Sequence, residues 1–349
     1  MNTIILAGGG HAHLAGIADG SLRHFPHTEV ILISPSRYQY YSGMFSGFTE
    51  GIYSEEQIRI DLSVLSQKHG FTFIEEEITA IDEAAKEVIT SSGRSFSYGL
   101  LSLDIGSAQA SSPSILPIKP NYSFPEAIRS FREGDQPVIV GGGASGVELS
   151  LAAAGYRRLN EIGSPVTLIS GGPLLSSAHN QKLLQICQQK GVTVIQNKKA
   201  RLLGSEAIDA GEDTRIPFSH LLWLGGPEAP SLFKNSGLRI DGNGFLPVDE
   251  RLMHSPSIFG AGDCVSITRY PELPKNGVYA VRQSKVLWEN LKRTAEKREL
   301  VPFQPQRRFL AILSTGGKAG FLTYGRFHYH GKTAWNLKHA IDRRYMNSF

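Results

Sequence analysis

Residues 136–155 read QPVIVGGGASGVELSLAAAG, and this stretch decides the fold. A short apolar run leads into Gly141, Gly143 and Gly146 at the spacing G-x-G-x-x-G, and a helix-like pattern carrying Glu148 follows. A strand, a glycine turn and a helix in this order bring backbone N–H groups and the positive end of the helix dipole toward a pyrophosphate. The stretch therefore predicts a dinucleotide-binding βαβ unit.

A second copy of this unit opens the chain. Residues 3–14 read TIILAGGGHAHL, where Gly8 and Gly10 satisfy the turn and His13 replaces the third glycine, which normally lets helix and strand pack closely. We expect a slightly displaced helix, or an imidazole ring turned away from the strand. The runs EVILIS (29–34) and PVTLIS (165–170) close the two units. Two units predict an α/β fold with parallel sheets and either two dinucleotides or two halves of one site.

A third glycine-rich turn lies in SPSIFGAGDCV, residues 255–265. A carboxylate such as Asp263 beside the backbone of Gly262 suits a polyol hydroxyl, although an ordinary aspartate turn is the alternative. Ser34 and Ser170 end the second strand of each unit, where an acidic residue commonly accepts ribose hydroxyls. The choice between NADH and NADPH therefore stays open.

Length and composition favour an enzyme of two domains. The chain has 349 residues, of which 41% are hydrophobic and 19% charged, and no apolar run is long enough for a membrane-spanning helix. The N-terminus is interpreted as a first strand rather than an export signal. Cys187 and Cys264 form no redox or zinc pattern, and the pairs His11/His13 and His328/His330 lack a third ligand, so we expect no metal and a reducing, cytoplasmic setting.

The C-terminal 49 residues are strongly basic. They contain one acid, Asp342, and the following basic residues: Arg307, Arg308, Lys318, Arg326, Lys332, Lys338, Arg343 and Arg344. Such a segment faces anionic lipid, an acidic partner, a phosphate-bearing ligand or simply solvent. The pattern of residues 333–346 puts Ala334, Leu337, Ile341 and Tyr345 on one helical stripe. Packing on the chain itself, on a second copy and on a membrane surface are all left open, and no nucleic-acid partner is expected.

Several segments together carry a family resemblance. In chain order they are residues 8–13, YGLLSLDIGS (98–107), GGGASGVE (141–148), LLWLGG (221–226) and IFGAGD (258–263). The chain resembles flavoproteins of the pyridine nucleotide-disulfide oxidoreductase superfamily along nearly its whole length, within the branch of type II NADH dehydrogenases and sulfide:quinone oxidoreductases. It is most similar to NADH-dehydrogenase-like flavoproteins, some fused to selenide, water dikinase, which share GGGHAHL, YYSGM, IKP, GVYAVRQ and IDRRYM.

The resemblance implies two Rossmann-like domains, the second inserted in the first. An FAD domain would comprise residues 1–112 and 245–302, an NAD(P)H domain residues 113–244, and a C-terminal cap, interface or membrane-surface segment residues 303–349. The FAD-binding positions expected from the resemblance and the turns are Gly8, Gly10, His11, Ser34, Gly262, Asp263 and Val278. Those for NAD(P)H are Gly141, Gly143, Gly146, Glu148 and Ser170. Glu148 and Lys119 are the candidate catalytic residues, and Arg282 is a further candidate for contact near the flavin.

Some residues depart from the family pattern, and these departures limit which reactions are expected. The chain lacks the redox cysteine pair of the disulfide reductases, and Val278 stands where type II NADH dehydrogenases carry a quinone-site glutamine. Gly99 and Asp104 also replace the usual residues of their segment. A dithiol relay is thus not expected, and a quinone acceptor rests on analogy.

The resemblance implies an FAD-dependent oxidoreductase that accepts hydride from NAD(P)H and passes electrons to a quinone or another small acceptor. The alternative is a flavoprotein of slight redox activity that acts as a binding or regulatory partner, linked to selenium metabolism. A location on the inner face of the membrane and a homodimer are both left open.

Overall fold

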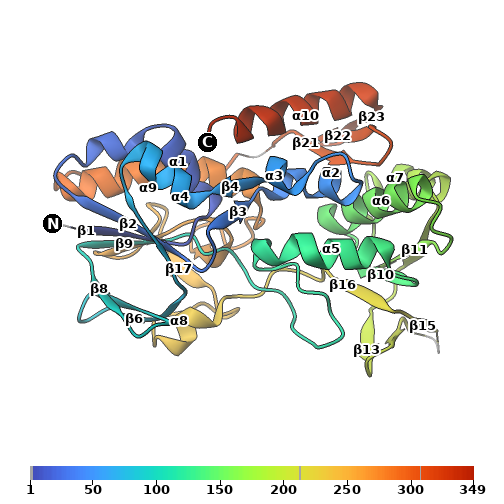
Figure 1. Ribbon diagram of the computed structural model, residues 1–349, viewed down its shortest axis with the longest axis horizontal. Coiled ribbons are helices and arrows are strands. Elements are labelled where there is room, and N and C mark those ends of the chain that lie inside the picture. The colour runs from blue at the N-terminus through green and yellow to red at the C-terminus, as the bar shows by residue number, and fades with distance from the viewer. Residues whose placement is uncertain (1–2, 212–213, 307) are drawn as a thin grey trace.

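The computed structural model describes residues 3–211, 214–306 and 308–349. Arg307, one of the basic residues of the C-terminal segment, lies outside the described residues. Two parallel sheets stand side by side, with a C-terminal sheet and helix lying across both (Figure 1).

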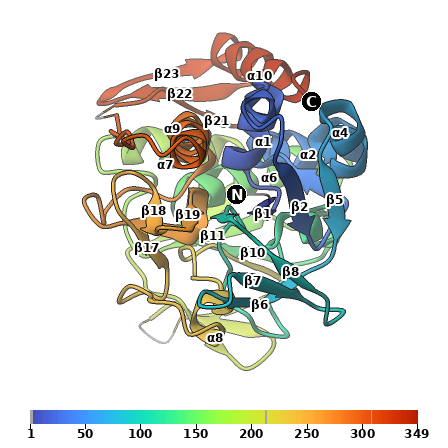
Figure 2. The ribbon, with the colours of Figure 1, turned by 90° about the vertical axis from the view of Figure 1, so that its left-hand side faces the viewer.

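The first sheet combines strands from both ends of the chain. Its order is β18 (Met253–Ser255), β19 (Ile258–Gly260), β9 (Leu100–Leu103), β1 (Thr3–Ala7), β2 (Glu29–Ser34) and β5 (Thr72–Glu75). The strands run parallel except β18, which is antiparallel to β19. Helices α1 (His11–Ala18) and α9 (Gly277–Ala295) pack together on one face, where Trp288 Nε1 and Ser284 Oγ both donate to the carbonyl of Ala12 (Figure 2). Burial on both faces explains why β1 is apolar from Ile4 to Ala7 and why every residue of β9 is buried.

The second sheet is built from the middle of the chain and is parallel throughout. Its order is β12 (Val192–Gln196), β11 (Val166–Ser170), β10 (Pro137–Val140) and β16 (His220–Trp223). Helices α5 (Phe124–Glu133), α6 (Ala144–Leu159) and α7 (Asn180–Gln189) accompany it. The predicted strands and glycine turns are therefore confirmed. The middle position of this sheet agrees with an inserted domain, while the boundaries at 112/113 and 244/245 stay predictions.

Short elements complete the two units. The small sheets contain β3 (Tyr38–Tyr40) with β4 (Arg59–Asp61), β6 (Ile78–Asp82) with β7 (Glu87–Thr90) and β8 (Ser95–Ser97), β13 (Arg201–Leu203) with β14 (Ala207–Asp209) and β15 (Arg215–Pro217), and β17 (Leu246–Val248) with β20 (Val265–Ile267). The short helices are α2 (Phe45–Thr49), α3 (Glu55–Ile58), α4 (Leu62–His69), α8 (Ser231–Asn235) and the 3-10 turns η1 (Ser21–His24), η2 (Ser42–Met44), η3 (Asn121–Ser123) and η4 (Gly262–Cys264).

The C-terminal segment packs on its own chain. It forms an antiparallel sheet of β21 (Ala311–Ser314), β22 (Gly320–Tyr324) and β23 (Phe327–Gly331), followed by α10 (Lys332–Met346). Both views place α10 over the side of the molecule that carries α1 and α2 (Figures 1 and 2). The Tyr53 hydroxyl lies 2.6 Å from His339 Nδ1, and the Tyr345 hydroxyl lies 3.4 Å from His11 Nδ1.

Only part of the predicted apolar stripe of α10 faces inward. Ala334 is buried and Tyr345 stacks on Tyr41, but Leu337 and Ile341 are 41% and 46% exposed, whereas Asp342 is only 4% exposed. Lys338 and Asp342 turn inward because they pair with each other and with polar groups beneath the helix. Among the described residues, no helix is both long and apolar enough to cross a bilayer.

We expect Phe124→Ala to lower the free energy of unfolding by about 3–5 kcal/mol, the usual cost of truncating a buried aromatic side chain. Phe124 is fully buried and stacks on Phe45 of the α2 helix with ring centroids 3.7 Å apart. Leu159→Ala is the matched control, because Leu159 is 71% exposed and its truncation should cost less than about 0.5 kcal/mol. Urea unfolding followed by circular dichroism measures both, and equal stability of the two variants would contradict this account.

Candidate functional site

A large cavity of about 2160 Å³ lies between the two sheets and under the C-terminal segment. Its walls include Gly8, Gly10 and His11 of the first turn, and Ala144, Ser145 and Glu148 from the start of α6. The glycines of the second turn, Gly141, Gly143 and Gly146, do not line it themselves, but the helix that follows them does. Drug-sized ligands occupy about 300–1,000 Å³, so this volume suits larger ligands such as dinucleotides.

The first turn is shaped by a close backbone approach. Gly8 has φ +88°, and a Cβ there would lie 2.6 Å from the carbonyl oxygen of Asp104. Gly10 directly precedes α1 and contributes no side-chain cap. The start of α1 therefore faces the cavity with the close-approaching backbone that a pyrophosphate requires.

His11 lies at the mouth of α1, covered by aromatic side chains. Its ring stands edge-on to Tyr41 and Tyr345, with centroids 5.6 and 5.9 Å away, and its Nε2 is 3.5 Å from Ser42 Oγ. Burial lowers the pKa of His11, although nearby Asp263 opposes that shift. Sequence analysis did not anticipate that Tyr345, from the far end of the chain, covers this position.

The His13 ring is not turned away from the strand, so that expectation is wrong, while a displaced helix stays a prediction. The side chain is fully buried: Nδ1 lies 2.7 Å from the carbonyl of Gly8, and Nε2 lies 2.8 Å from Ser102 Oγ on β9. Burial lowers the pKa of His13 to about 4. The neutral imidazole thus links the turn to the neighbouring strand, where a glycine would leave only a backbone contact.

The third turn brings opposite charges together at the cavity wall. Lys119 Nζ lies 3.8 Å from Asp263 Oδ2 and donates to Ser107 Oγ. Burial lowers the pKa of Lys119, while Asp263 raises it. Lys275, which sequence analysis did not single out, also lines the cavity and donates to the carbonyl of Val265. Glycine at 262 is required, since its φ is +72° and a Cβ would lie 2.3 Å from Asp104 Oδ1.

The start of α9 forms another part of the wall. Asn276 caps this helix by accepting from Tyr279 N at 3.1 Å. Val278 and Arg282 both line the cavity, and Val278 is 38% exposed. An apolar side chain therefore occupies the position of the quinone-site glutamine.

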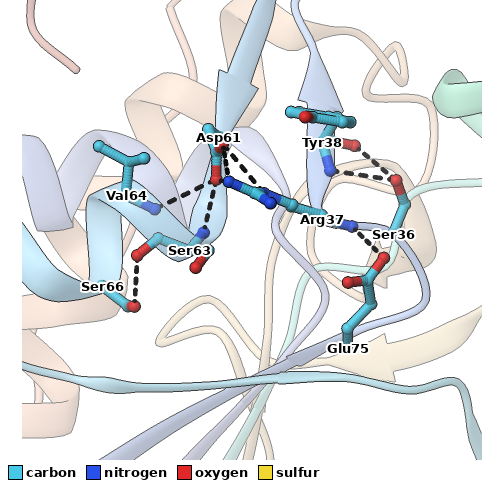
Figure 3. A network of polar contacts seen from close by, with 8 residues as sticks. All are labelled: Ser36, Arg37, Tyr38, Asp61, Ser63, Val64, Ser66 and Glu75. Atoms are coloured by element: carbon cyan, nitrogen blue, oxygen red, sulfur yellow. Dashed lines mark hydrogen bonds and ion pairs between the residues drawn. The ribbon is translucent and has the colours of Figure 1, made fainter.

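No acid ends β2, but acidic groups lie on the neighbouring elements. Ser34 lines the cavity and is in register with Glu75 of β5, whose Oε1 accepts from Arg37 N at 3.0 Å. The Arg37 guanidinium binds Asp61 with two nitrogens, and this hydrogen bonding lowers the pKa of Asp61 (Figure 3). Asp61 also caps α4 through Ser63 N and Val64 N (Figure 3). This pairing orders the segment after Ser34 and was not foreseen from the sequence.

The second turn repeats the geometry of the first. A Cβ on Gly141 would lie 2.3 Å from the carbonyl oxygen of Leu224, and one on Gly146 would lie 1.8 Å from that of Gly141. Around Gly143, at the start of α6, an added Cβ would meet open space. Ser170 lies under this turn, buried, with its hydroxyl donating to the Gly172 carbonyl at 2.7 Å. Unlike Ser34, it is not part of the cavity wall as described.

Glu148 belongs to a largely buried charge network. Its Oε1 accepts from Ser46 Oγ and Ser314 N and lies 3.9 Å from Lys338 Nζ. Lys338 Nζ also pairs with Asp342 Oδ2 at 2.9 Å, and the Tyr41 hydroxyl donates to Asp342 Oδ1 at 3.1 Å. The side chains of Tyr41, Glu148, Lys338 and Asp342 all line the cavity.

Burial raises the pKa of both carboxyl groups in this network, with Lys338 opposing the shift. Burial alone would lower the pKa of Lys338, but Glu148 and Asp342 outweigh it and the net shift is upward. Two carboxyl groups that share one ammonium favour retention of a proton. The network is therefore suited to holding and releasing a proton at the cavity wall.

Both thiols are buried. Burial raises the pKa of Cys187 and of Cys264 to about 12, and Cys264 Sγ contacts the carbonyl of Ala261 at 3.3 Å. Because the thiolate is the reactive form, neither environment favours thiol chemistry. Within the described ranges, no three His, Cys, Asp or Glu side chains are grouped to hold a metal ion.

Comparison with known proteins identifies the family. Residues 2–284 match the pyridine nucleotide-disulphide oxidoreductase family. The chain belongs to this family. Membership confirms the predicted resemblance, the α/β fold class and the assignment as an oxidoreductase. The family and the structural neighbours named below also indicate the expected cofactors, FAD and a nicotinamide dinucleotide.

Relatives and solved structures agree with this placement. A probable NADH dehydrogenase of Dictyostelium discoideum is 27% identical over 213 residues, which cover 56% of this chain and 46% of that protein. An NADH dehydrogenase-like protein of Mycobacterium tuberculosis is 24% identical over 231 residues, covering 59% and 58% of the two chains. The matched part of the chain thus spans about half the length of these curated relatives.

Two solved structures have the same fold. The sulfide:quinone oxidoreductase of Aquifex aeolicus has a TM-score of 0.82 at 18% identity, covering 99% of this chain and 91% of its own. NDH2 of Plasmodium falciparum in complex with NADH has a TM-score of 0.82 at 14% identity, covering 99% and 96%.

We expect the buried histidine to make stability pH dependent. The unfolded His13 takes up a proton near its ordinary pKa of 6.5, whereas folded His13 does so only near 4. As pH falls from 6.5 to 4, the wild type should therefore lose about 3 kcal/mol relative to His13→Asn, which has no imidazole to protonate.

Urea unfolding of both proteins at pH 4, 5, 6 and 7 measures this difference. His328→Asn serves as the control for loss of a histidine outside the turn. A wild-type-to-variant difference that stays constant from pH 7 to 4 would refute the assignment of a neutral, buried imidazole.

Proposed function

We propose that the protein is an FAD-dependent oxidoreductase that accepts hydride from NAD(P)H and passes electrons to a quinone or another small acceptor. One observation carries this proposal: the first glycine turn, the start of the α6 helix that follows the second turn, and the Glu148–Lys338–Asp342 network line the same cavity. The activity follows from family membership together with this convergence.

In the proposed arrangement, FAD is held by the first turn and by the third. Gly8, Gly10 and His11 lie at the start of α1, and Gly262 approaches the Asp104 carboxylate as Gly10 does. Asp263, Ser34 and Val278 line the cavity. FAD would supply the redox chemistry when bound, and the protein contributes binding and orientation. Lys119 offsets the negative charge of Asp263, 3.8 Å away.

NAD(P)H is assigned to the second turn, at Gly141, Gly143 and Gly146, with Glu148 and Ser170 as further positions. The open space at Gly143 supports the approach of a pyrophosphate to the start of α6. NADH and NADPH remain equal alternatives, because Ser170 supplies neither a carboxylate for a ribose hydroxyl nor a cation for a phosphate.

The charge network provides the proton chemistry of the proposed acceptor step. A quinone that takes up two electrons also takes up two protons, so it needs a proton source at the reduction site. The carboxyl groups of Glu148 and Asp342 hold a proton readily, since burial raises the pKa of both groups. Lys338 stays charged between them and keeps the two carboxyl groups oriented.

We also propose the domain limits 1–112 with 245–302, 113–244 and 303–349, and a cytoplasmic protein that contacts the inner face of the membrane peripherally. Leu337 on α10 and Phe327 and Tyr329 on β23 are exposed in this basic segment and support this contact. A homodimer is the alternative.

The decisive measurement is anaerobic reduction of the purified protein. We expect NADH or NADPH to bleach the flavin absorbance, and a soluble quinone to restore it. Bleaching without reoxidation by quinone would remove the quinone as acceptor and leave the dehydrogenase assignment intact. Absence of bleaching with both nucleotides would reject that assignment and favour the binding or regulatory flavoprotein.

We expect Lys338→Met to slow flavin reoxidation by quinone about 100-fold, the usual scale for loss of general acid–base catalysis, because Glu148 and Asp342 lose the ammonium group that orients both of them. Flavin reduction by NADH should change less than about threefold, since the hydride transfer itself needs no proton from this network. Stopped-flow absorbance separates the two steps. Lys332→Met, which removes an exposed lysine from the same helix, is the control. Equal reoxidation rates in both variants would exclude a proton role for the network.

A further inference from the structure

Asp104 occupies a position that distinguishes the first turn from the second. In each unit, the residue after the partner strand donates its N–H to the last strand residue before the turn: Asp104 N to Ala7 O at 2.9 Å, and Leu224 N to Val140 O at 2.7 Å. Each also presses its carbonyl against the first glycine, Gly8 or Gly141. The two residues are thus equivalent in the fold, but one is an aspartate and the other a leucine.

The Asp104 side chain fills the space at the start of α1. Its Oδ2 accepts from Ala12 N at 2.6 Å and from His13 N at 3.2 Å, so it supplies the cap that Gly10 lacks. A Cβ on Gly10 would lie 2.1 Å from Asp104 Cγ, whereas one on Gly143 in the second unit would meet open space. A carboxylate therefore stands on the cavity wall where the helix end would otherwise face an incoming phosphate.

The charges around Asp104 add to the electrostatic repulsion between its carboxylate and an incoming phosphate. Asp263 faces it from η4, and a diphosphate would add two more negative charges. The nearby cations, Lys119 and Lys275, lie on the Asp263 side, where Lys119 is engaged with Asp263. His11 and His13 on α1 are neutral near pH 7 because burial lowers their pKa values. No cation thus compensates Asp104 directly from the elements described here.

We propose that the Asp104 carboxylate competes with the FAD diphosphate for the start of α1, so that FAD binds more tightly when Asp104 is protonated. This inference rests on the proposed FAD site at the first turn. Asp104 is then an affinity-determining residue rather than a catalytic one, and FAD affinity depends on pH.

Asp104 changes its protonation state within a pH range in which the protein can be studied. Burial raises the pKa of Asp104 to about 7, with Asp263 adding to the shift and the N–H groups of His13 and Ala12 opposing it. Cys264 and Tyr345, which also interact with Asp104, do not change charge in this pH range. Burial raises the pKa of Cys264 to about 12, and burial raises the pKa of Tyr345 as well. A bound diphosphate raises the pKa of Asp104 further, and each unit of that increase is a tenfold preference for FAD binding to the protonated form.

The test measures FAD dissociation from the purified flavoprotein by ultrafiltration between pH 6.0 and 8.5. We expect the Kd of the wild type to rise about tenfold over this range, and that of Asp104→Asn to change less than about twofold. Asn retains an acceptor for Ala12 N and His13 N but carries no charge. Glu126→Gln, which neutralises an exposed acid on α5, is the control and should follow the wild type.

The wild-type profile tests the inference even if the variant folds poorly. A wild-type Kd that stays within twofold from pH 6.0 to 8.5 would overturn it, as would weaker FAD binding by a folded Asp104→Asn at pH 8.5. If neither protein carries FAD at any pH, the proposed FAD site itself fails, and this outcome is distinct from FAD binding that ignores pH.

Discussion

The structure depends on a close backbone approach that occurs twice. In each unit a glycine turn packs directly against the carbonyl at the end of the partner strand, with no room for a Cβ at Gly8 or Gly141. This contact holds the start of the following helix at the carboxyl ends of the parallel strands. Because both helices are positioned in this way, their N-terminal ends open toward one cavity between the sheets. The proposed dinucleotide sites thus depend on sheet packing rather than on any single polar side chain.

The C-terminal segment contributes charged and aromatic side chains that contact both units at the cavity. Helix α10 turns Lys338 and Asp342 inward against Glu148 of the second unit and Tyr41 of the first, and Tyr345 covers His11. Burying such charges is costly unless each is paired, which these are. The polar inner face of α10 therefore connects both units around the cavity and leaves the apolar side chains Leu337 and Ile341 exposed.

Some substitutions in the turns reveal how the two units have diverged. His13 replaces a glycine, yet its neutral ring bonds the Gly8 carbonyl and Ser102, so the helix keeps its contact with the sheet. Asp104 caps the same helix from β9, whereas Leu224 makes the equivalent turn apolar. The first unit thus keeps the close packing of Gly8 but replaces its third glycine with a polar network at His13, whereas the second unit keeps a glycine there, Gly146.

The sequence by itself determined the parallel strands, the two glycine turns and the third turn at Gly262 and Asp263, because each depends on local patterns of apolar residues and glycines. It also placed Lys119 among the candidates, and the structure puts it beside Asp263. Only the tertiary structure decided which face of α10 is buried, how the His13 ring is oriented, and that Lys338 pairs with both Glu148 and Asp342. The pair of Lys338 and Glu148 joins residues 190 positions apart, and such pairing of charges in space is encoded by no local pattern.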